Sequence, residues 1–167
     1  MFVSKPSTAS SKREQYADLL AQLASLFESE RDGLANAANL SALVFDALPE
    51  LNWCGFYFLR GGELVLGPFQ GKVACVRIAL GRGVCGTAAQ ARRTVVVPDV
   101  HAFPGHIACD SASRSEIVVP LVHEGKLFGV LDLDSPRESR FDADDAAGLE
   151  AVVALLLGRS DLGRLVG

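Results

Sequence analysis

Apolar residues recur every three or four positions in the first part of the chain. The pattern is clearest over residues 12–30, where charged and amide side chains separate the apolar ones, and it returns over residues 34–48. This period is that of an amphipathic helix with one buried face. The pattern therefore predicts two helices before Pro49. Residues 1–10 show no such period and are expected to form a flexible tail.

Beyond Pro49 the apolar residues lie in short runs bounded by glycine and polar residues, which is typical of strands. Gly61-Gly62 and Glu124-Gly125 each separate two such runs and predict the turns of two hairpins. A short helix is expected over residues 87–92, and a last helix is expected to begin after Asp142 as its N-cap. The six expected strands cover residues 52–60, 64–66, 74–80, 94–97, 116–123 and 126–134.

The order of these elements indicates the fold class. Two hairpins on either side of a strand–helix–strand unit, with helices at both ends, favour one six-stranded antiparallel sheet with helices packed on it. The expected class is therefore α+β, with residues 11–167 forming a single domain.

Composition and charge exclude several kinds of partner. Of the 167 residues, 49% are hydrophobic and 22% charged, which is typical of a globular protein that buries a large core. The net charge is −4 and the basic residues are scattered, so no nucleic-acid partner is expected. No apolar run approaches the length of a membrane span or forms a signal peptide. We therefore expect a cytoplasmic protein that does not bind membranes.

The cysteine spacing excludes further classes of protein. Intervals of 21, 10 and 24 residues fit neither a tight zinc motif nor a disulfide-rich secreted domain. No metal or organic cofactor is expected, and the cysteines should be resting or reactive thiols. The four cysteines are Cys54, Cys75, Cys85 and Cys109.

Two of these cysteines have informative surroundings. Cys54 lies in an aromatic run and is predicted to belong to the core. Cys109 lies in a long polar loop, residues 99–115, between His106 and Asp110. A polar loop gives access to the thiol and allows electrostatic tuning of its pKa, which favours a reactive thiol. From this pattern alone, a buried and inert thiol at Cys109 is expected as often as a reactive one.

Three acidic residues, Glu116, Asp132 and Asp134, stand on strands that should be neighbours in the second hairpin. Side chains alternate along a strand, so Asp132 and Asp134 share a face. A carboxylate cluster in one cavity would raise the pKa of its members and leave one of them protonated at neutral pH. The alternative is that these acids end their strands in solvent, the commoner position for a single Asp.

Residues 81–86 match G-x-G-x-x-G after a strand and before a helix, with Asp99 at a suitable distance for a dinucleotide site. The hairpins stand where further βαβ crossovers should be, and they argue against that interpretation. We instead expect a glycine-rich turn at a helix N-terminus, where backbone N–H groups such as those of Gly83 and Val84 hold a ligand carboxylate.

The order of elements and the closing segment, residues 127–135 (LFGVLDLDS), resemble a GAF domain over nearly the whole chain. Five separated segments carry a more specific pattern: residues 52–57 (NWCGFY), 74–78 (ACVRI), 81–88 (GRGVCGTA), 105–110 (GHIACD) and 115–118 (SEIV). In these five motifs the chain resembles the free methionine-(R)-sulfoxide reductases, a family with the GAF fold. The resemblance implies a GAF-like fold and thiol-dependent reduction of free L-methionine (R)-S-oxide, not of sulfoxide within proteins. It also implies thioredoxin as the reductant and a homodimer.

Reduction of a sulfoxide by thiols needs three kinds of group. A thiolate attacks sulfur, an acid protonates the oxygen, and a second thiol removes the sulfenic acid as a disulfide. The resemblance assigns the attack to Cys109 and slightly favours Cys75 as the resolving thiol. Cys85 is then a relay or an alternative partner.

The resemblance also assigns roles in the predicted pocket. Glu116 and Asp134 would act on the sulfoxide oxygen, and Asp132 would bind the substrate amino group. Trp53 would pack against the S-methyl group, with Tyr57 lining the same wall. Without the resemblance, Trp53 would be taken as a core residue.

Two other functions compete with this interpretation. The chain could be a GAF sensor that binds a small molecule or responds to redox state without chemistry. It could also be a hydrolase with Cys109 as nucleophile and His106 as base. The second is disfavoured because no third group is evident that would orient the histidine.

Overall fold

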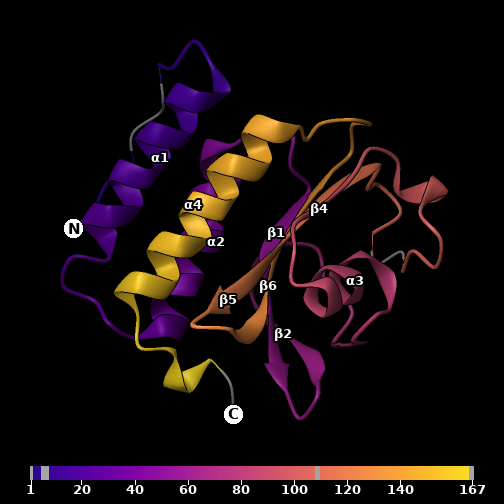
Figure 1. Ribbon diagram of the computed structural model, residues 1–167. Helices are drawn as coiled ribbons and strands as arrows, with labels where there is room; N and C mark the ends of the chain where they lie inside the picture. The colour runs from indigo at the N-terminus through magenta and orange to yellow at the C-terminus, as the bar shows by residue number, and fades with distance from the viewer. Residues whose placement is uncertain (1, 5–7, 108–109, 166–167) are drawn as a thin grey trace.

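The computed structural model describes residues 2–4, 8–107 and 110–165 of the chain. Helices α2 and α4 pack on one face of a six-stranded sheet, α1 packs against these two helices, and α3 lies against the opposite face of the sheet (Figure 1). The elements are α1 (Lys12–Leu26), α2 (Gly33–Ala47), β1 (Trp53–Arg60), β2 (Glu63–Gly71), β3 (Arg77–Ala79), α3 (Gly83–Ala91), β4 (Val95–Val97), the 3-10 turn η1 (Val100–Ala102), β5 (Ser115–His123), β6 (Lys126–Ser135), α4 (Ala143–Arg159) and the 3-10 turn η2 (Leu162–Arg164).

The strands are ordered β3-β2-β1-β6-β5-β4, and every neighbouring pair is antiparallel. The turns at Gly61-Gly62 and Glu124-Gly125 have positive φ at both residues. That backbone suits the right-handed twist of a two-residue hairpin, which is why glycine recurs there. The predicted α+β class with a six-stranded antiparallel sheet is confirmed.

The two faces of the sheet carry separate cores because side chains alternate along each strand. On β1, the side chains of Cys54, Phe56 and Phe58 pack into the core under α1, α2 and α4. Trp53 and Tyr57 point to the opposite side, into the core under α3. The predicted core position of Cys54 is confirmed, since none of its surface is exposed.

A buried polar network joins α1 to α4 on the helical face. The Asp145 carboxylate accepts hydrogen bonds from Lys12 Nζ at 2.5 Å, Tyr16 Oη at 2.9 Å and Arg140 Nη1 at 3.2 Å. Asp142 caps α4 as predicted, and its side chain forms a capping box with Asp145. This network therefore fixes the first helix against the last one.

Two helices differ from the expected bounds. Helix α1 ends at Leu26, four residues before the expected end, and Phe27 is buried as its C-cap residue. Helix α3 begins at Gly83, four residues before the expected start. Within the part of the chain that the structure describes, no helix combines the length and apolar character needed to cross a membrane.

Strand β3 is shorter than expected, covering residues 77–79 of the predicted 74–80. It is an edge strand and pairs only with the start of β2, through Glu63 to Val65. The preceding segment leaves the sheet, and Ala74 lines a pocket under α3. The apolar run over residues 74–80 thus forms part of the pocket wall as well as strand β3.

Candidate active site

A pocket of about 40 Å³ lies between the sheet and the first turn of α3. Strands β1, β5 and β6 supply its floor, and the segments before β3 and before β5 supply its walls. It brings together most of the site residues predicted from sequence, namely Trp53, Tyr57, Gly83, Val84, Cys85, Glu116, Asp132 and Asp134.

The sheet register brings the three acids together. Glu116 on β5 is paired with Asp134 on β6, and Asp134 is paired with Trp53 on β1. Asp132 lies two residues before Asp134 and therefore on the same face. Alternation along the strands and antiparallel pairing between them thus place all three carboxyl groups under α3.

Burial controls the protonation of this cluster. The pKa values of Glu116 and Asp134 are raised well above the ordinary range, first by burial and then by the charge of Asp132. Burial also raises the pKa of Asp132, to about 7, although hydrogen bonds from Cys85 and Glu116 oppose part of that rise. At neutral pH the pocket therefore keeps protonated carboxyl groups that can donate a proton.

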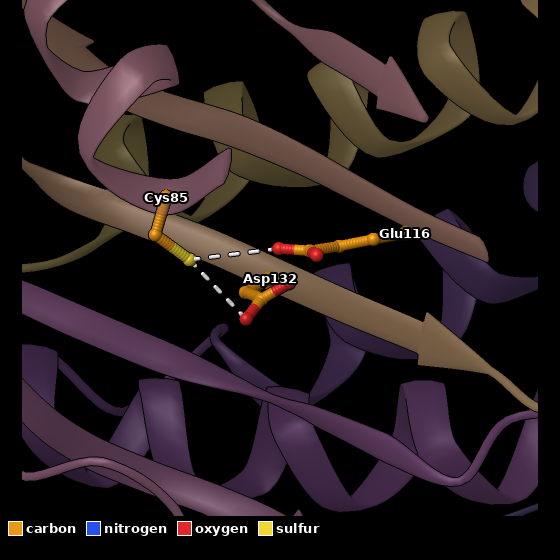
Figure 2. A group of neighbouring side chains, drawn as sticks. All are labelled: Cys85, Glu116 and Asp132. Atoms are coloured by element: carbon orange, nitrogen blue, oxygen red, sulfur yellow. Dashed lines mark hydrogen bonds between the residues drawn. The ribbon is translucent and has the colours of Figure 1, made fainter. Parts of the chain in front are cut away.

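Cys85 completes this acidic group from the side of α3 (Figure 2). Its thiol donates to Asp132 Oδ2 at 3.2 Å and lies 4.0 Å from Glu116 Oε1. Burial, followed by the charges of Asp132 and Glu116, raises the pKa of this thiol well above its ordinary value. Cys85 is free and is held as a thiol, not as a thiolate.

An aromatic wall faces the acids. The Trp53 ring stacks on Phe69 at 5.3 Å and on Tyr57 at 5.9 Å between centroids. Trp53 Nε1 donates to the Lys72 carbonyl, and Tyr57 Oη donates to the Cys75 carbonyl, both at 3.0 Å. Because the segment after β2 satisfies both polar atoms, the rings present apolar surface to the pocket.

Gly55, between the two aromatic residues on β1, was not among the predicted site residues. A Cβ at this position would lie 2.3 Å from Phe69 Cβ and 2.7 Å from Trp53 Cη2. A side chain here would therefore displace the aromatic wall. The signal in the sequence was a glycine inside a strand, which indicates close approach by another group.

Asn52 was also not among the predicted site residues. Its Nδ2 donates to Asp110 Oδ2 at 3.1 Å and to Ser113 Oγ at 3.0 Å. Asp110 Oδ1 accepts from the backbone N–H of Ala112, and Lys72 Nζ lies 3.5 Å away. These contacts fix the end of the long loop to the start of β1.

His106 lies beside the acids, with Nε2 3.7 Å from Glu116 Oε2. Burial, followed by the charge of His101, lowers the pKa of the imidazole. The pKa of Glu116 is raised, so the two groups meet as neutral partners at neutral pH and not as an ion pair. His106 is thus an uncharged neighbour of the proposed proton donor.

The first turn of α3 closes the pocket. Arg82 is its N-cap and makes no side-chain capping hydrogen bond, which leaves the first-turn N–H groups without that partner. Gly83 has φ +58°, and a Cβ there would lie 3.2 Å from Ile107. The positive end of the helix dipole and these N–H groups favour an anionic ligand group.

Comparison with known proteins identifies the family. The GAF domain family matches residues 14–158. The free methionine-R-sulfoxide reductase of Escherichia coli (strain K12) is 53% identical over 145 residues, which are 87% of this chain and 88% of the relative. The chain belongs to the free methionine-R-sulfoxide reductases. Its fold is correspondingly that of a GAF domain.

Solved structures of free methionine-R-sulfoxide reductases agree with this assignment. The enzyme from Neisseria meningitidis in complex with its substrate is 46% identical, with a TM-score of 0.92 over 98% of each chain. The reduced form of fRMsr of Staphylococcus aureus is 50% identical, with a TM-score of 0.84 over 95% of this chain and 99% of the other.

The cysteines of this free methionine-R-sulfoxide reductase differ in whether they are free or disulfide-bonded. Cys75 is disulfide-bonded, whereas Cys54 and Cys85 are free. Cys109, the predicted attacking thiol, lies outside the described residues, so its position in the pocket is still a prediction. Asp110, which follows it, lines the pocket.

Proposed function

We propose that this chain reduces free L-methionine (R)-S-oxide to L-methionine with its own cysteine thiols. The observation that carries the proposal is the buried acid cluster of Glu116, Asp132 and Asp134, which retains protons at neutral pH opposite an apolar aromatic wall. A sulfoxide oxygen becomes a leaving oxygen only when it is protonated, and this cluster supplies the proton. Membership in the reductase family supports the same chemistry.

In the first step, the Cys109 thiolate attacks the sulfoxide sulfur while Glu116 or Asp134 protonates the oxygen. Attack forms a transient bond between the Cys109 sulfur and the substrate sulfur. The oxygen then passes to the Cys109 sulfur as that bond and the sulfur–oxygen bond of the substrate break, so methionine leaves and Cys109 is left as a sulfenic acid. In the second step, the Cys75 thiol attacks the sulfenic sulfur, water leaves, and a disulfide forms. The sum is one sulfoxide and two thiols converted to methionine, one disulfide and water.

Cys75 is the better resolving thiol. It takes part in a disulfide, whereas Cys85 is free and donates to Asp132. Its raised pKa also makes Cys85 a poor source of thiolate. We therefore place Cys85 in the pocket wall and keep a relay role only as the alternative.

The same pocket accounts for recognition of a free amino acid. In this proposal Asp132 accepts the substrate ammonium group and the N–H groups of Gly83 and Val84 hold its carboxylate, which is supported by the position of all three residues in the pocket lining. The methyl and methylene groups would pack on Trp53 and Tyr57. A residue within a peptide lacks both charges and should be excluded.

We further propose thioredoxin as the electron donor, in a cytoplasmic homodimer. Val73 and Val76, on either side of Cys75, are 87% and 64% exposed. Exposed apolar side chains beside a disulfide suit a protein reductant that must dock there. Replacing Val76 by Asp should raise the KM for thioredoxin at least threefold and leave the KM for sulfoxide unchanged, with Val3→Asp as an exposed control.

The central experiment supplies the (R) sulfoxide, the (S) epimer and a peptide-bound sulfoxide separately, with a thioredoxin system, and follows NADPH oxidation. Turnover of the free (R) epimer alone, lost in Cys109→Ser and kept in Cys54→Ser, is the expected result. No turnover by folded, reduced wild type would overturn the proposal and favour a GAF sensor.

A further inference from the structure

A buried thiol and two buried carboxyl groups converge beneath α3 (Figure 2). One ligand atom each from Cys85, Glu116 and Asp132 lies within 4.8 Å of the other two, and the side chains come from α3, β5 and β6. The three residues are 4%, 5% and 6% exposed. Three rigid elements therefore hold these donors at fixed spacing.

The spacing matches that of ligands around a small tetrahedral ion. Zinc binds thiolate sulfur at roughly 2.3 Å and carboxylate oxygen at roughly 2.0 Å, which places sulfur and oxygen about 3.5 Å apart. The distances from Cys85 Sγ are 3.2 Å to Asp132 Oδ2 and 4.0 Å to Glu116 Oε1. They lie on either side of the ideal value, so small side-chain shifts would complete the geometry.

A second observation points to a cationic ligand. Among the residues that the structure describes, Asp132 Oδ1 is buried and has no hydrogen-bond partner, and Asp132 lines the pocket. A buried carboxylate oxygen left without a partner is costly, and a cation bound to this carboxylate would offset that cost. The neighbouring thiol of Cys85 selects among cations, because thiolate prefers zinc to magnesium or calcium.

We propose that this pocket also binds a zinc ion, with Cys85, Glu116 and Asp132 as its protein ligands. His106, whose Nε2 is 3.7 Å from Glu116 Oε2, or a water molecule takes the fourth position. Because Asp132 is also the proposed partner of the substrate ammonium group, zinc and substrate exclude each other. That last step, inhibition by zinc, rests on the proposed function.

The binding test uses Cys75→Ser/Cys109→Ser protein, which cannot chelate metal through the two proposed redox thiols. Titration with Co²⁺, a spectroscopic substitute for zinc, should give one equivalent of ion with a thiolate-to-cobalt charge-transfer band, and Zn²⁺ should remove the band. A further Cys85→Ser change should abolish it. The matched Cys54→Ser change should leave it intact, because Cys54 lies in the opposite core.

Two further measurements test the zinc site even if one of the pocket variants unfolds. Glu116→Gln and Asp132→Asn should each weaken Co²⁺ binding at least tenfold while the circular dichroism spectrum is unchanged. With all pocket residues intact, free methionine (R)-sulfoxide should displace the ion competitively. No thiolate band in the Cys75→Ser/Cys109→Ser protein, or a band that persists in its Cys85→Ser derivative, would overturn the proposal.

Inhibition is tested in a single turnover without added reductant, which avoids metal binding to thioredoxin. Reduced Cys75→Ser protein should form one equivalent of methionine, at least tenfold more slowly with stoichiometric Zn²⁺, and a chelator should restore the rate. Cobalt binding without turnover in metal-free protein would contradict the proposed function alone. Turnover that is insensitive to zinc would contradict the inference alone.

Discussion

At Asp132 the sheet places a carboxyl group where solvent hardly reaches, with the thiol of Cys85 donating to one oxygen. Burial raises its pKa from the ordinary 3.8 to about 7, so the folded protein binds a proton that the unfolded chain releases. Such a group contributes stability that is fully present below its unfolded pKa. That stability is lost as pH rises through the folded pKa, here between about 4 and 7.

Replacing Asp132 by Asn should therefore stabilise the protein at high pH while it abolishes substrate binding. The pKa change corresponds to roughly 4 kcal/mol at most. We expect the free energy of unfolding at pH 8 to rise by about 2 to 4 kcal/mol, with little difference from wild type at pH 4. Urea unfolding at the two pH values measures this, and a variant less stable than wild type at pH 8 would contradict it.

Glu116 should control the rate of the chemical step more than binding. Gln keeps the shape of the side chain but cannot give up a proton, so Glu116→Gln should lower kcat by roughly 10² to 10⁴ with little change in KM. In wild type, kcat should fall as pH rises through the raised pKa of this cluster. The exposed Glu28→Gln is the matched control. An unchanged kcat in Glu116→Gln would remove the residue from proton transfer.

The positions of the three pocket acids could be predicted from the sequence. Period-two alternation was enough to place Asp132 and Asp134 on one face, and the hairpin placed Glu116 beside them. The sequence indicated that one carboxyl group would stay protonated. It could not show how far each pKa rises, because that depends on how completely α3 covers the cluster. The anchoring by Asn52 could not be predicted, since its partner Asp110 is 58 positions away along the chain.

At the scale of elements, α3 is set by its contact with the end of β3. A Cβ on Gly86 would lie 2.3 Å from the Ala79 carbonyl oxygen, so glycine lets the first turn of the helix approach this backbone closely. The G-x-G-x-x-G pattern thus reflects close packing and a helix start. Hairpins were predictable because their turn residues are local, whereas the start of α3 and the length of β3 depend on contacts between distant segments.

A pair of glycine substitutions tests this packing. Gly86→Ala should displace α3, lower the melting temperature and raise KM for the sulfoxide at least fivefold. Gly158→Ala, in α4, has no atom within 4 Å of the added Cβ and should stabilise the protein by about 0.5 to 1 kcal/mol. Thermal unfolding and steady-state kinetics of both variants provide the comparison. Equal behaviour of the two would contradict the packing argument.

At the scale of the whole molecule, the sheet separates stability from chemistry. Helices α1, α2 and α4 lie on one side of the sheet and α3 on the other (Figure 1). The first side holds an apolar core and the ion network around Asp145, while the α3 side holds the pocket. The buried residues on the two faces form two separate groups. Changes on the helical face should therefore alter the folding equilibrium without altering the reaction.

Asp145→Asn tests that separation. The substitution leaves the buried Arg140 guanidinium, 5% exposed at its side chain, without a charged partner, and it weakens the contacts of Lys12 and Tyr16. Breaking a buried ion pair on one side costs about 3 to 5 kcal/mol, so the urea midpoint should fall sharply. At low temperature, where the variant remains folded, kcat and KM should stay within twofold of wild type. Activity lost in protein whose circular dichroism spectrum is native would mean that the two faces are coupled through the sheet.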